Sequence, residues 1–260
     1  MMRPQAKRAW QVLELGPQWQ SRRPEQRGVA SAVVAVPSSS IEGEPVERGG
    51  PGPVVVDQPV VARVALPHDL VALRDQVSGC MACPLAATRR QTVFGIGPIE
   101  ARCMIIGEAP GEEEDARGEP FIGKAGQLLD RMLSEIGLGR SIDVYITNVV
   151  KCRPPGNRNP APEEMAACAA FLARQVELVR PKVLLLLGRF AIQSMLRTDA
   201  SVGSLRGRVH HLSAGGREVP AIVSYHPAYL LRNPPEKRKS WDDLLLLAEL
   251  IDRTPADPAS

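Results

Sequence analysis

Four of the five cysteines in this 260-residue chain are spaced so that they constrain its fold. Cys80 and Cys83 form a C-x2-C pair, and Cys152 and Cys168 flank a Pro- and Asn-rich stretch, residues 153–162. A C-x2-C turn puts two sulfurs on one side of a tight backbone, where one metal ion or cluster can bind both. If one centre binds all four thiols, the segment around residue 80 must pack onto the middle of the chain.

Spacing alone does not decide between four alternatives: free buried cysteines, a disulfide pair, structural zinc and an iron–sulfur cluster. Among the metal centres it slightly favours zinc. Disulfides are disfavoured because nothing in the sequence is typical of secretion: residues 1–16 are basic but lack an apolar stretch and a small-residue cleavage site. No apolar run approaches the roughly 20 residues that a membrane span needs. We therefore expect a cytoplasmic, reducing location, which suits thiolate ligands.

The first 66 residues differ from the rest of the chain. They are rich in Pro, Gly, Ser, Val and Arg, and no helical or strand period persists in them. This composition predicts a mostly disordered N-terminal extension. The segment that contains Trp10 and Trp19 is a candidate peptide for binding a repair or replication partner, although an inert extension is favoured. Residues 254–260 are expected to be a short C-terminal tail.

From Leu66 onward, apolar patterns of helical and strand type alternate, so a domain is predicted over residues 67–253. Helices are predicted over 69–78, 126–136, 163–179, 190–196 and 241–251, and strands over 103–107, 144–150, 183–187 and 219–225. This alternation predicts an α/β fold with a mainly parallel sheet covered on both faces. In such sheets the functional residues lie just beyond the carboxyl ends of the strands.

Three predicted strand ends carry unusual polar residues. Glu108 follows the first strand in a Gly- and Pro-rich loop, Asn148 lies in the second, and His226 follows the last one before a Pro-bounded loop. Each has an ordinary alternative, since turns, helix caps and satisfied core positions use the same residue types. Together with Phe121, a candidate stacking ring, they would make a pocket that contains a carboxylate, an amide and a hydrogen-bond donor. A buried amide can read the edge of a heterocycle through paired donor and acceptor bonds.

The charge and aromatic content limit how the chain can meet nucleic acid. The formal net charge is only +3, so any contact must come from a local patch. Aromatic residues make up 4% of the chain, which disfavours a single-strand-binding surface built on stacking.

Four segments of the chain resemble those of the family 4, iron–sulfur uracil-DNA glycosylases. They are Gly-Glu-Ala-Pro-Gly-x3-Asp, Pro-Phe-Ile-Gly-x-Ala-Gly, Tyr-Ile-Thr-Asn-Val-Val-Lys-Cys-Arg-Pro-Pro and His-Pro-Ala-Tyr-Leu-Leu-Arg. The match runs in order from about Leu66 to Ile251, and the N-terminal extension lies outside it. The resemblance implies a three-layer α/β/α fold and uracil excision in base excision repair.

The resemblance also implies a [4Fe-4S] cluster on Cys80, Cys83, Cys152 and Cys168, which reverses the preference for zinc. Cys103 matches no ligand position and is expected in the core.

Individual site residues carry roles by the same resemblance. Phe121 matches the ring that stacks on uracil, Asn148 the amide that reads its edge, and His226 the histidine near uracil O2. Glu108 matches the loop carboxylate and is our first choice for positioning water, with Glu114 or a backbone carbonyl as alternatives. Ala109, also assigned to the substrate pocket, stands where the best-studied uracil glycosylases place an Asp that orients the water.

The expected partner is uracil-containing DNA, single- or double-stranded, bound by a monomer. Leu230 or Leu231 is the candidate wedge in the base stack, and Arg232 the phosphate contact, with Arg206, Arg208 and residues 237–239 as further candidates. There are two alternatives to a glycosylase: a relative that traps uracil-DNA covalently, and a cluster-stabilised DNA-binding module without turnover. The trapping relatives carry a His-bearing basic insertion after the second strand, which this chain lacks.

Overall fold

The computed structural model describes residues 66–253. The expectations for the N-terminal extension, with Trp10 and Trp19, and for the tail 254–260 lie outside these residues. No helix among the described residues is both long and apolar enough to cross a bilayer.

A single five-stranded sheet organises the described residues, in the order β2-β1-β3-β5-β4. The strands are β1 Cys103–Gly107, β2 Val144–Asn148, β3 Val183–Leu187, β4 Val209–Ala214 and β5 Arg217–Ser224. β1, β2, β3 and β5 are mutually parallel, and β4 pairs antiparallel with β5 at one edge. The predicted mainly parallel α/β sheet is therefore confirmed, with one edge strand that was not predicted.

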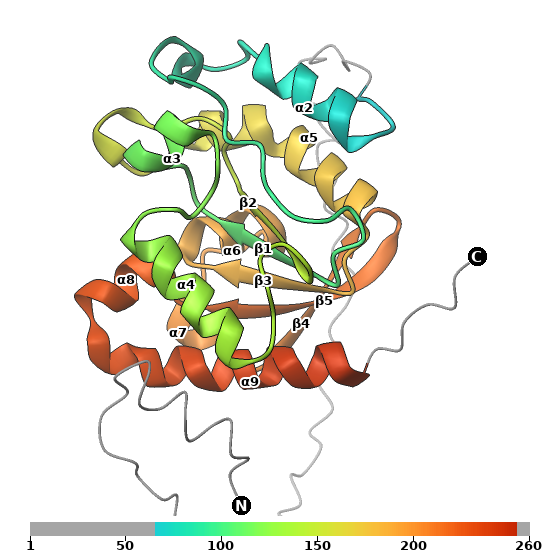
Figure 1. Ribbon diagram of the computed structural model, residues 1–260, viewed down its shortest axis with the longest axis vertical. Coiled ribbons are helices and arrows are strands. Elements are labelled where there is room, and N and C mark those ends of the chain that lie inside the picture. Colours follow the sequence, from blue (N-terminus) through green and yellow to red (C-terminus); the bar gives the residue numbers. More distant parts are fainter. Residues whose placement is uncertain (1–65, 254–260) are drawn as a thin grey trace, which may run out of the picture. The chain divides into compact units, whose positions relative to one another are not determined.

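Helices lie on both faces of the sheet (Figure 1). The α-helices are α2 Leu70–Ser78, α3 Glu112–Arg117, α4 Lys124–Glu135, α5 Pro162–Val179, α6 Arg189–Leu196, α7 Val202–Leu205, α8 Pro227–Arg232 and α9 Lys237–Arg253. Three short 3-10 helices are η1 Pro84–Ala87, η2 Pro155–Asn157 and η3 Pro234–Glu236. The predicted helix at 241–251 thus begins four residues earlier, and the loops expected at 112–117 and 227–232 are helical.

Alternate strand residues face two separate cores, because successive side chains of a strand point to opposite faces of the sheet. On one face Ile105 and Ile146 pack with α4, α8 and α9, whose Trp241 is 1% exposed. On the other face Ile106 and Leu186 pack with α5, α6 and α7. The three-layer α/β/α arrangement follows directly from this alternation. Cys103 is buried in the first core, as expected.

The segment around the C-x2-C pair is attached to α5. α2 begins with Asp69 as its N-cap, whose side chain accepts a hydrogen bond from the Ala72 amide. Its buried Leu73 and Val77 form a small third core with Phe94, against which Phe171 of α5 packs. The N-terminal part of the described chain is therefore held beside the middle of the chain by apolar contacts.

Candidate active site

A cavity of about 690 Å³ opens at the carboxyl ends of the four parallel strands. We call it the strand-end cavity. Each of these strands delivers side chains to it: Glu108 and Ala109 follow β1, Asn148 ends β2, Arg189 follows β3 and His226 follows β5. Glu108, Asn148 and His226 were predicted from their place at strand ends, and Ala109 from the family resemblance. The candidate ring Phe121 also lines the cavity. The structure therefore brings the predicted pocket residues together.

Asn148 presents an unsatisfied acceptor at the floor of the cavity. The residue is 1% exposed, and its Oδ1 has no hydrogen-bond partner. Gly107, its register partner on β1, leaves open the space in front of this oxygen, since a Cβ on Gly107 would lie 2.5 Å from Asn148 Oδ1 and would also meet the Phe121 ring. A buried acceptor without a partner is costly unless a ligand supplies the donor. The Asn148 amide is therefore placed to read a bound ligand.

The Phe121 ring is held by a strained and well-anchored loop. Phe121 has a left-handed backbone (φ 55°) and is 5% exposed. Arg140 donates to the carbonyl oxygens of Pro120 and Phe121, at 2.7 and 2.6 Å, and is itself paired with Asp130 at 2.8 Å. Gly126 in α4 allows the Phe121 carbonyl to approach the helix backbone, because a Cβ there would overlap it. These contacts fix the ring at the cavity wall.

Glu114 holds the two loops on either side of α3 together. Its Oε2 accepts from the Gly111 amide at 3.1 Å, and its Oε1 accepts from the amides of Ile122 and Gly123 at 3.0 and 3.1 Å. Both carboxylate oxygens are thus engaged with backbone donors. Glu114 acts as a positioning residue for the loop that carries Phe121, which leaves Glu108 as the less constrained carboxylate of the cavity.

His226 is a neutral imidazole that presents one N–H to the cavity. Its Nδ1 accepts from the Ala228 amide at 3.2 Å as the N-cap of α8, so the ring proton resides on Nε2. Burial lowers the pKa of His226 to about 4, and the Arg232 charge lowers it further in the same direction, against an opposing effect of Glu114. The His226 ring lies 5.4 Å from the Phe121 ring, centroid to centroid. The cavity therefore contains a donor that carries no charge at neutral pH.

Glu108 is a half-buried carboxylate whose ionisation is tuned by two arginines. Burial raises its pKa above the ordinary value, and the charges of Arg189 and Arg232 act in the opposite direction. Arg232 was predicted near the pocket. Arg189, the first residue of α6, was missed, although its place directly after a strand end was a usable signal.

The four predicted cysteines line one small cavity between η1, the segment after β2, and α5, together with Arg89, Lys151 and Phe171. Arg89 Nη1 donates to Cys152 Sγ at 3.2 Å. Burial raises the pKa of the Cys168 thiol to about 11, while the Lys151 ammonium acts in the opposite direction. Among the described residues, no three His, Cys, Asp or Glu side chains are close enough together to share one metal ion.

Lys151 connects the cysteine cavity with the strand-end cavity and was also missed. Its side chain is 1% exposed, and its Nζ donates to the Asn148 carbonyl oxygen at 2.6 Å and to Thr147 Oγ1 at 2.7 Å. The next residue in the chain is Cys152. A lysine that holds the end of β2 is invisible to sequence patterns, because a Lys after a strand is usually solvated.

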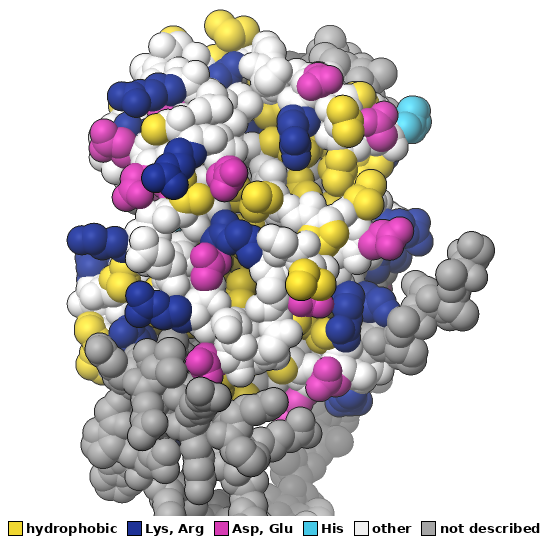
Figure 2. Space-filling model, in the orientation of Figure 1, with side chains coloured by type: hydrophobic (Ala, Val, Ile, Leu, Met, Phe, Trp, Pro, Cys, Tyr) yellow, Lys and Arg dark blue, Asp and Glu magenta, His cyan; other side chains and the backbone are white. Residues whose placement is uncertain are grey.

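The residues considered for DNA contact differ in their exposure and in whether they already have a partner within the fold. Leu230 is completely buried in the core, whereas Leu231 is 43% exposed. Arg206 pairs with the buried Asp243 at 2.9 Å, so its charge is already neutralised within the fold. Basic and acidic side chains alternate over the face seen in Figure 2, in keeping with the low net charge. Leu231 and Arg232 stay candidates as neighbours on α8, and the exposed Arg208 stays a further one.

Comparisons with known proteins identify the family to which the chain belongs. The sequence model of the uracil DNA glycosylase superfamily matches residues 94–245. A type-4 uracil-DNA glycosylase of Archaeoglobus fulgidus is 42% identical over 182 aligned residues, which cover 68% of this chain and 91% of that protein. The type-4 enzyme of Thermotoga maritima is 46% identical over 160 residues, covering 61% and 81%. A type-5 uracil-DNA glycosylase of Thermus thermophilus is 31% identical over 192 residues, covering 61% and 86%.

Proposed function

Because this chain belongs to the uracil DNA glycosylase superfamily, and within it to the type-4 enzymes, we propose that it hydrolyses the bond between uracil and deoxyribose in DNA, the first step of base excision repair. The observation that carries the proposal is the buried, unpartnered Oδ1 of Asn148, which lies beside the Phe121 ring above the bare Gly107. A base inside a duplex cannot reach such a site, so the nucleotide must be flipped into the cavity.

Recognition of uracil is assigned to Asn148 and Phe121. The Asn148 Oδ1 accepts the N3–H of the base, its amide nitrogen donates to O4, and the Phe121 ring packs on the face of the base. Cytosine offers an acceptor at N3 and a donor at N4, which leaves both Asn148 groups unpaired. A buried polar site rejects such a ligand strongly. Asn148 therefore supplies the discrimination between uracil and cytosine.

Bond cleavage is assigned to His226. As the glycosidic bond stretches, negative charge grows on the base, and a fixed donor at O2 stabilises that charge without reorganisation. The lowered pKa keeps the His226 ring neutral at neutral pH, and Nδ1 already accepts from a backbone amide. The single ring N–H, on Nε2, is therefore free to donate a hydrogen bond to O2 of the base. His226 thus contributes through electrostatics that act mainly in the transition state.

Positioning of the attacking water is assigned to Glu108. The Glu108 carboxylate lies just beyond the carboxyl end of β1. The charges of Arg189 and Arg232 favour its ionised form, against the effect of burial. Ala109 has no group that orients water, and both oxygens of Glu114 are held by backbone amides. Glu108 is therefore the carboxylate best placed to accept a hydrogen bond from the water that adds to the sugar cation.

The four cysteines are assigned to a [4Fe-4S] cluster with a structural role. All four thiols line one cavity, and Arg89 donates to one of them, an arrangement that suits an anionic centre. A tetrahedral zinc at about 2.3 Å from each sulfur needs the thiolates drawn tightly together. In a [4Fe-4S] cluster each thiolate binds a different iron, and the family resemblance favours this centre over a single zinc ion. Held there, Cys80 and Cys83 would fasten their segment to the end of β2.

Contact with DNA is assigned to the end of α8, where the exposed Leu231 acts as the wedge and Arg232 binds a phosphate. We also propose that the chain acts as a monomer in the cytoplasm. A partner for the N-terminal extension stays a prediction.

The test is excision from a labelled single-stranded oligonucleotide that contains one uracil, followed by alkaline cleavage of the abasic product. Strand scission at uracil and none at cytosine is expected, with a large loss for Asn148→Ala. A band that migrates as a covalent protein–DNA adduct on a denaturing gel would support the trapping alternative, and binding without scission would support the binding module. Either outcome overturns the assignment of turnover.

A further inference from the structure

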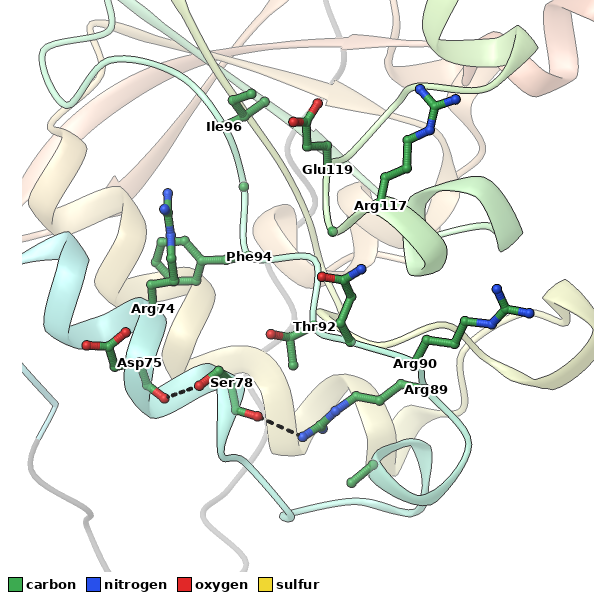
Figure 3. Close-up of a pocket in the computed structure, with 14 residues that line it drawn as sticks. Arg74, Asp75, Ser78, Arg89, Arg90, Thr92, Phe94, Ile96, Arg117 and Glu119 are labelled. Carbon is green, nitrogen blue, oxygen red and sulfur yellow. Dashed lines mark hydrogen bonds between the residues drawn. The ribbon is translucent and has the colours of Figure 1, made fainter.

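A second large hollow lies beside the strand-end cavity and has no role in the proposed chemistry. It measures about 720 Å³ and is bounded by α2, the segment 89–96 and the end of α3. Four arginines, Arg74, Arg89, Arg90 and Arg117, line it against two carboxylates, Asp75 and Glu119 (Figure 3). We call this hollow the arginine groove. Its lining has more arginines than carboxylates, which is a local excess of positive charge in a chain whose net charge is only +3.

Two of the four arginines are free to meet an external anion. Arg89 is engaged, since its Nη2 donates to the Ser78 carbonyl at 3.0 Å and its Nη1 to a cysteine sulfur. Arg74 lies over the Phe94 ring, 5.5 Å from its centroid. Arg90 and Arg117 are exposed, and neither takes part in an ion pair among the described residues.

The floor of the arginine groove is rigid and offers no stacking surface. Phe94 is only 3% exposed, and its carbonyl accepts from Thr147 Oγ1 and Gln175 Nε2, both at 2.8 Å. A base cannot stack on a ring that is buried and covered by Arg74. An anionic occupant would therefore be held through its charge, as phosphates are, and without reading base identity.

The arginine groove and the strand-end cavity share α3 as a common wall. Gly111 and Glu114, at the start of α3, line the strand-end cavity, whereas Arg117 and Gly118, at its end, line the groove. Six helical residues span about 9 Å. Each strand of a B-form duplex carries a phosphate about every 3.4 Å along the helix axis, so this separation corresponds to roughly three nucleotides of duplex.

We propose that the arginine groove binds the phosphates of the DNA strand that carries the uracil, about three nucleotides away from the flipped base, on one side of it. The proposal rests on the proposed function, because it takes the occupant of the strand-end cavity to be a nucleotide in that strand. Arg90 and Arg117 supply the two phosphate contacts, and the contacts are independent of sequence.

The test compares the double variant Arg90→Ala/Arg117→Ala with a control that loses the same charge elsewhere, Arg131→Ala/Arg253→Ala, in the full chain. Arg131 and Arg253 are exposed and line neither hollow. Affinity is measured against salt for single strands with a central abasic site and about one nucleotide on each side, too short to reach the groove, and for versions extended by about ten nucleotides on the 5′ or the 3′ side. Thermal unfolding confirms that each variant is folded.

We expect the groove variant to bind one of the two extended strands more weakly, with the slope of log K against log salt reduced by about 1.4, as the loss of two single-strand phosphate contacts requires. The control variant should keep the wild-type slope on every strand. An unchanged slope for the groove variant, or an equal reduction for the control, overturns the proposal. Excision of uracil from the short strand is measured for the same proteins. If the wild-type protein excises uracil while the binding result is negative, only the groove proposal fails, and the glycosylase assignment stands.

Discussion

Gly107 and Asn148 are register partners on β1 and β2, and the missing side chain of the first makes room for the amide of the second. Gly107→Ala should abolish most of the uracil excision, because the new methyl group would lie 2.5 Å from Asn148 Oδ1, where the base must bind. We expect a loss of at least about 10²-fold in the single-turnover rate constant, the scale of a lost active-site hydrogen bond.

The matched control is Gly139→Ala. A Cβ on Gly139 would meet its neighbours only at 3.8 Å or more, which is ordinary contact. This variant should excise uracil at the wild-type rate. Equal rates for the two glycine variants would show that the space in front of Asn148 does not hold the base.

Asn148→Asp separates recognition from catalysis. If the new carboxyl is protonated in its buried position, its hydroxyl can donate to cytosine N3 while its carbonyl accepts from N4. Uracil excision should fall, and slow release of cytosine should become measurable in single-turnover assays on matched uracil and cytosine strands. Wild-type excision of uracil by this variant would contradict the assignment of the amide.

His226 should make folding stability depend on pH. Its pKa lies at about 4 in the folded protein, below the 6.5 of an unperturbed histidine, so the unfolded chain takes up the proton first. Stability should therefore fall as the pH is lowered from about 6.5 to about 4, and rise in the opposite direction. His226→Asn keeps a side-chain acceptor for the start of α8 and should flatten this part of the stability curve, measured by denaturant unfolding at several pH values.

The same variant tests the catalytic role of His226. Loss of a donor that acts on developing charge typically lowers the rate by about 10²–10³-fold. Affinity for DNA that already carries an abasic site should change little, since no base occupies the cavity. A variant that binds the abasic product much more weakly but cleaves normally would place His226 outside the chemistry.

Arg189→Gln should shift the acid limb of the rate profile to higher pH. The Arg189 charge opposes the effect of burial on Glu108, so its removal raises the pKa of that carboxyl further. Protonated Glu108 cannot orient water, and the single-turnover rate should then begin to fall at a higher pH than in the wild type. Arg131→Gln, which removes an exposed charge away from the cavity, should leave the limb in place. A shift to lower pH would contradict the role of Glu108.

Cys152→Ser and Cys103→Ala should differ in colour. Protein purified without oxygen should contain iron and sulfide at about four each per chain, as a cubane cluster requires. Cys152 lines the cysteine cavity, so its loss should bleach or unfold the protein, whereas Cys103 is buried in the core below the sheet and its replacement should keep the absorbance. Stoichiometric zinc in colourless wild-type protein would contradict the cluster.

The sequence determined the repeating part of the fold and the identity of the pocket. Continuous apolar runs predicted β1 and β3 at their observed ends, and the polar residues at the ends of the parallel strands had to converge at one edge of the sheet. β4 was missed because its half-exposed residues lack an apolar run. α3 was missed because its sequence, Glu-Glu-Glu-Asp-Ala-Arg, has no apolar period and depends on acidic residues at its N-terminus and on Glu114.

The tertiary structure alone decided how individual side chains are used. Leu230 and Leu231 are adjacent and chemically identical, yet the first packs into the core and the second is exposed. Arg206 pairs with a buried aspartate, while Lys151 turns inward to hold Asn148. These outcomes depend on which distant segments meet, because the burial and partners of a side chain arise from packing between elements. Local periodicity and capping, which a sequence shows directly, specify the elements but not those contacts.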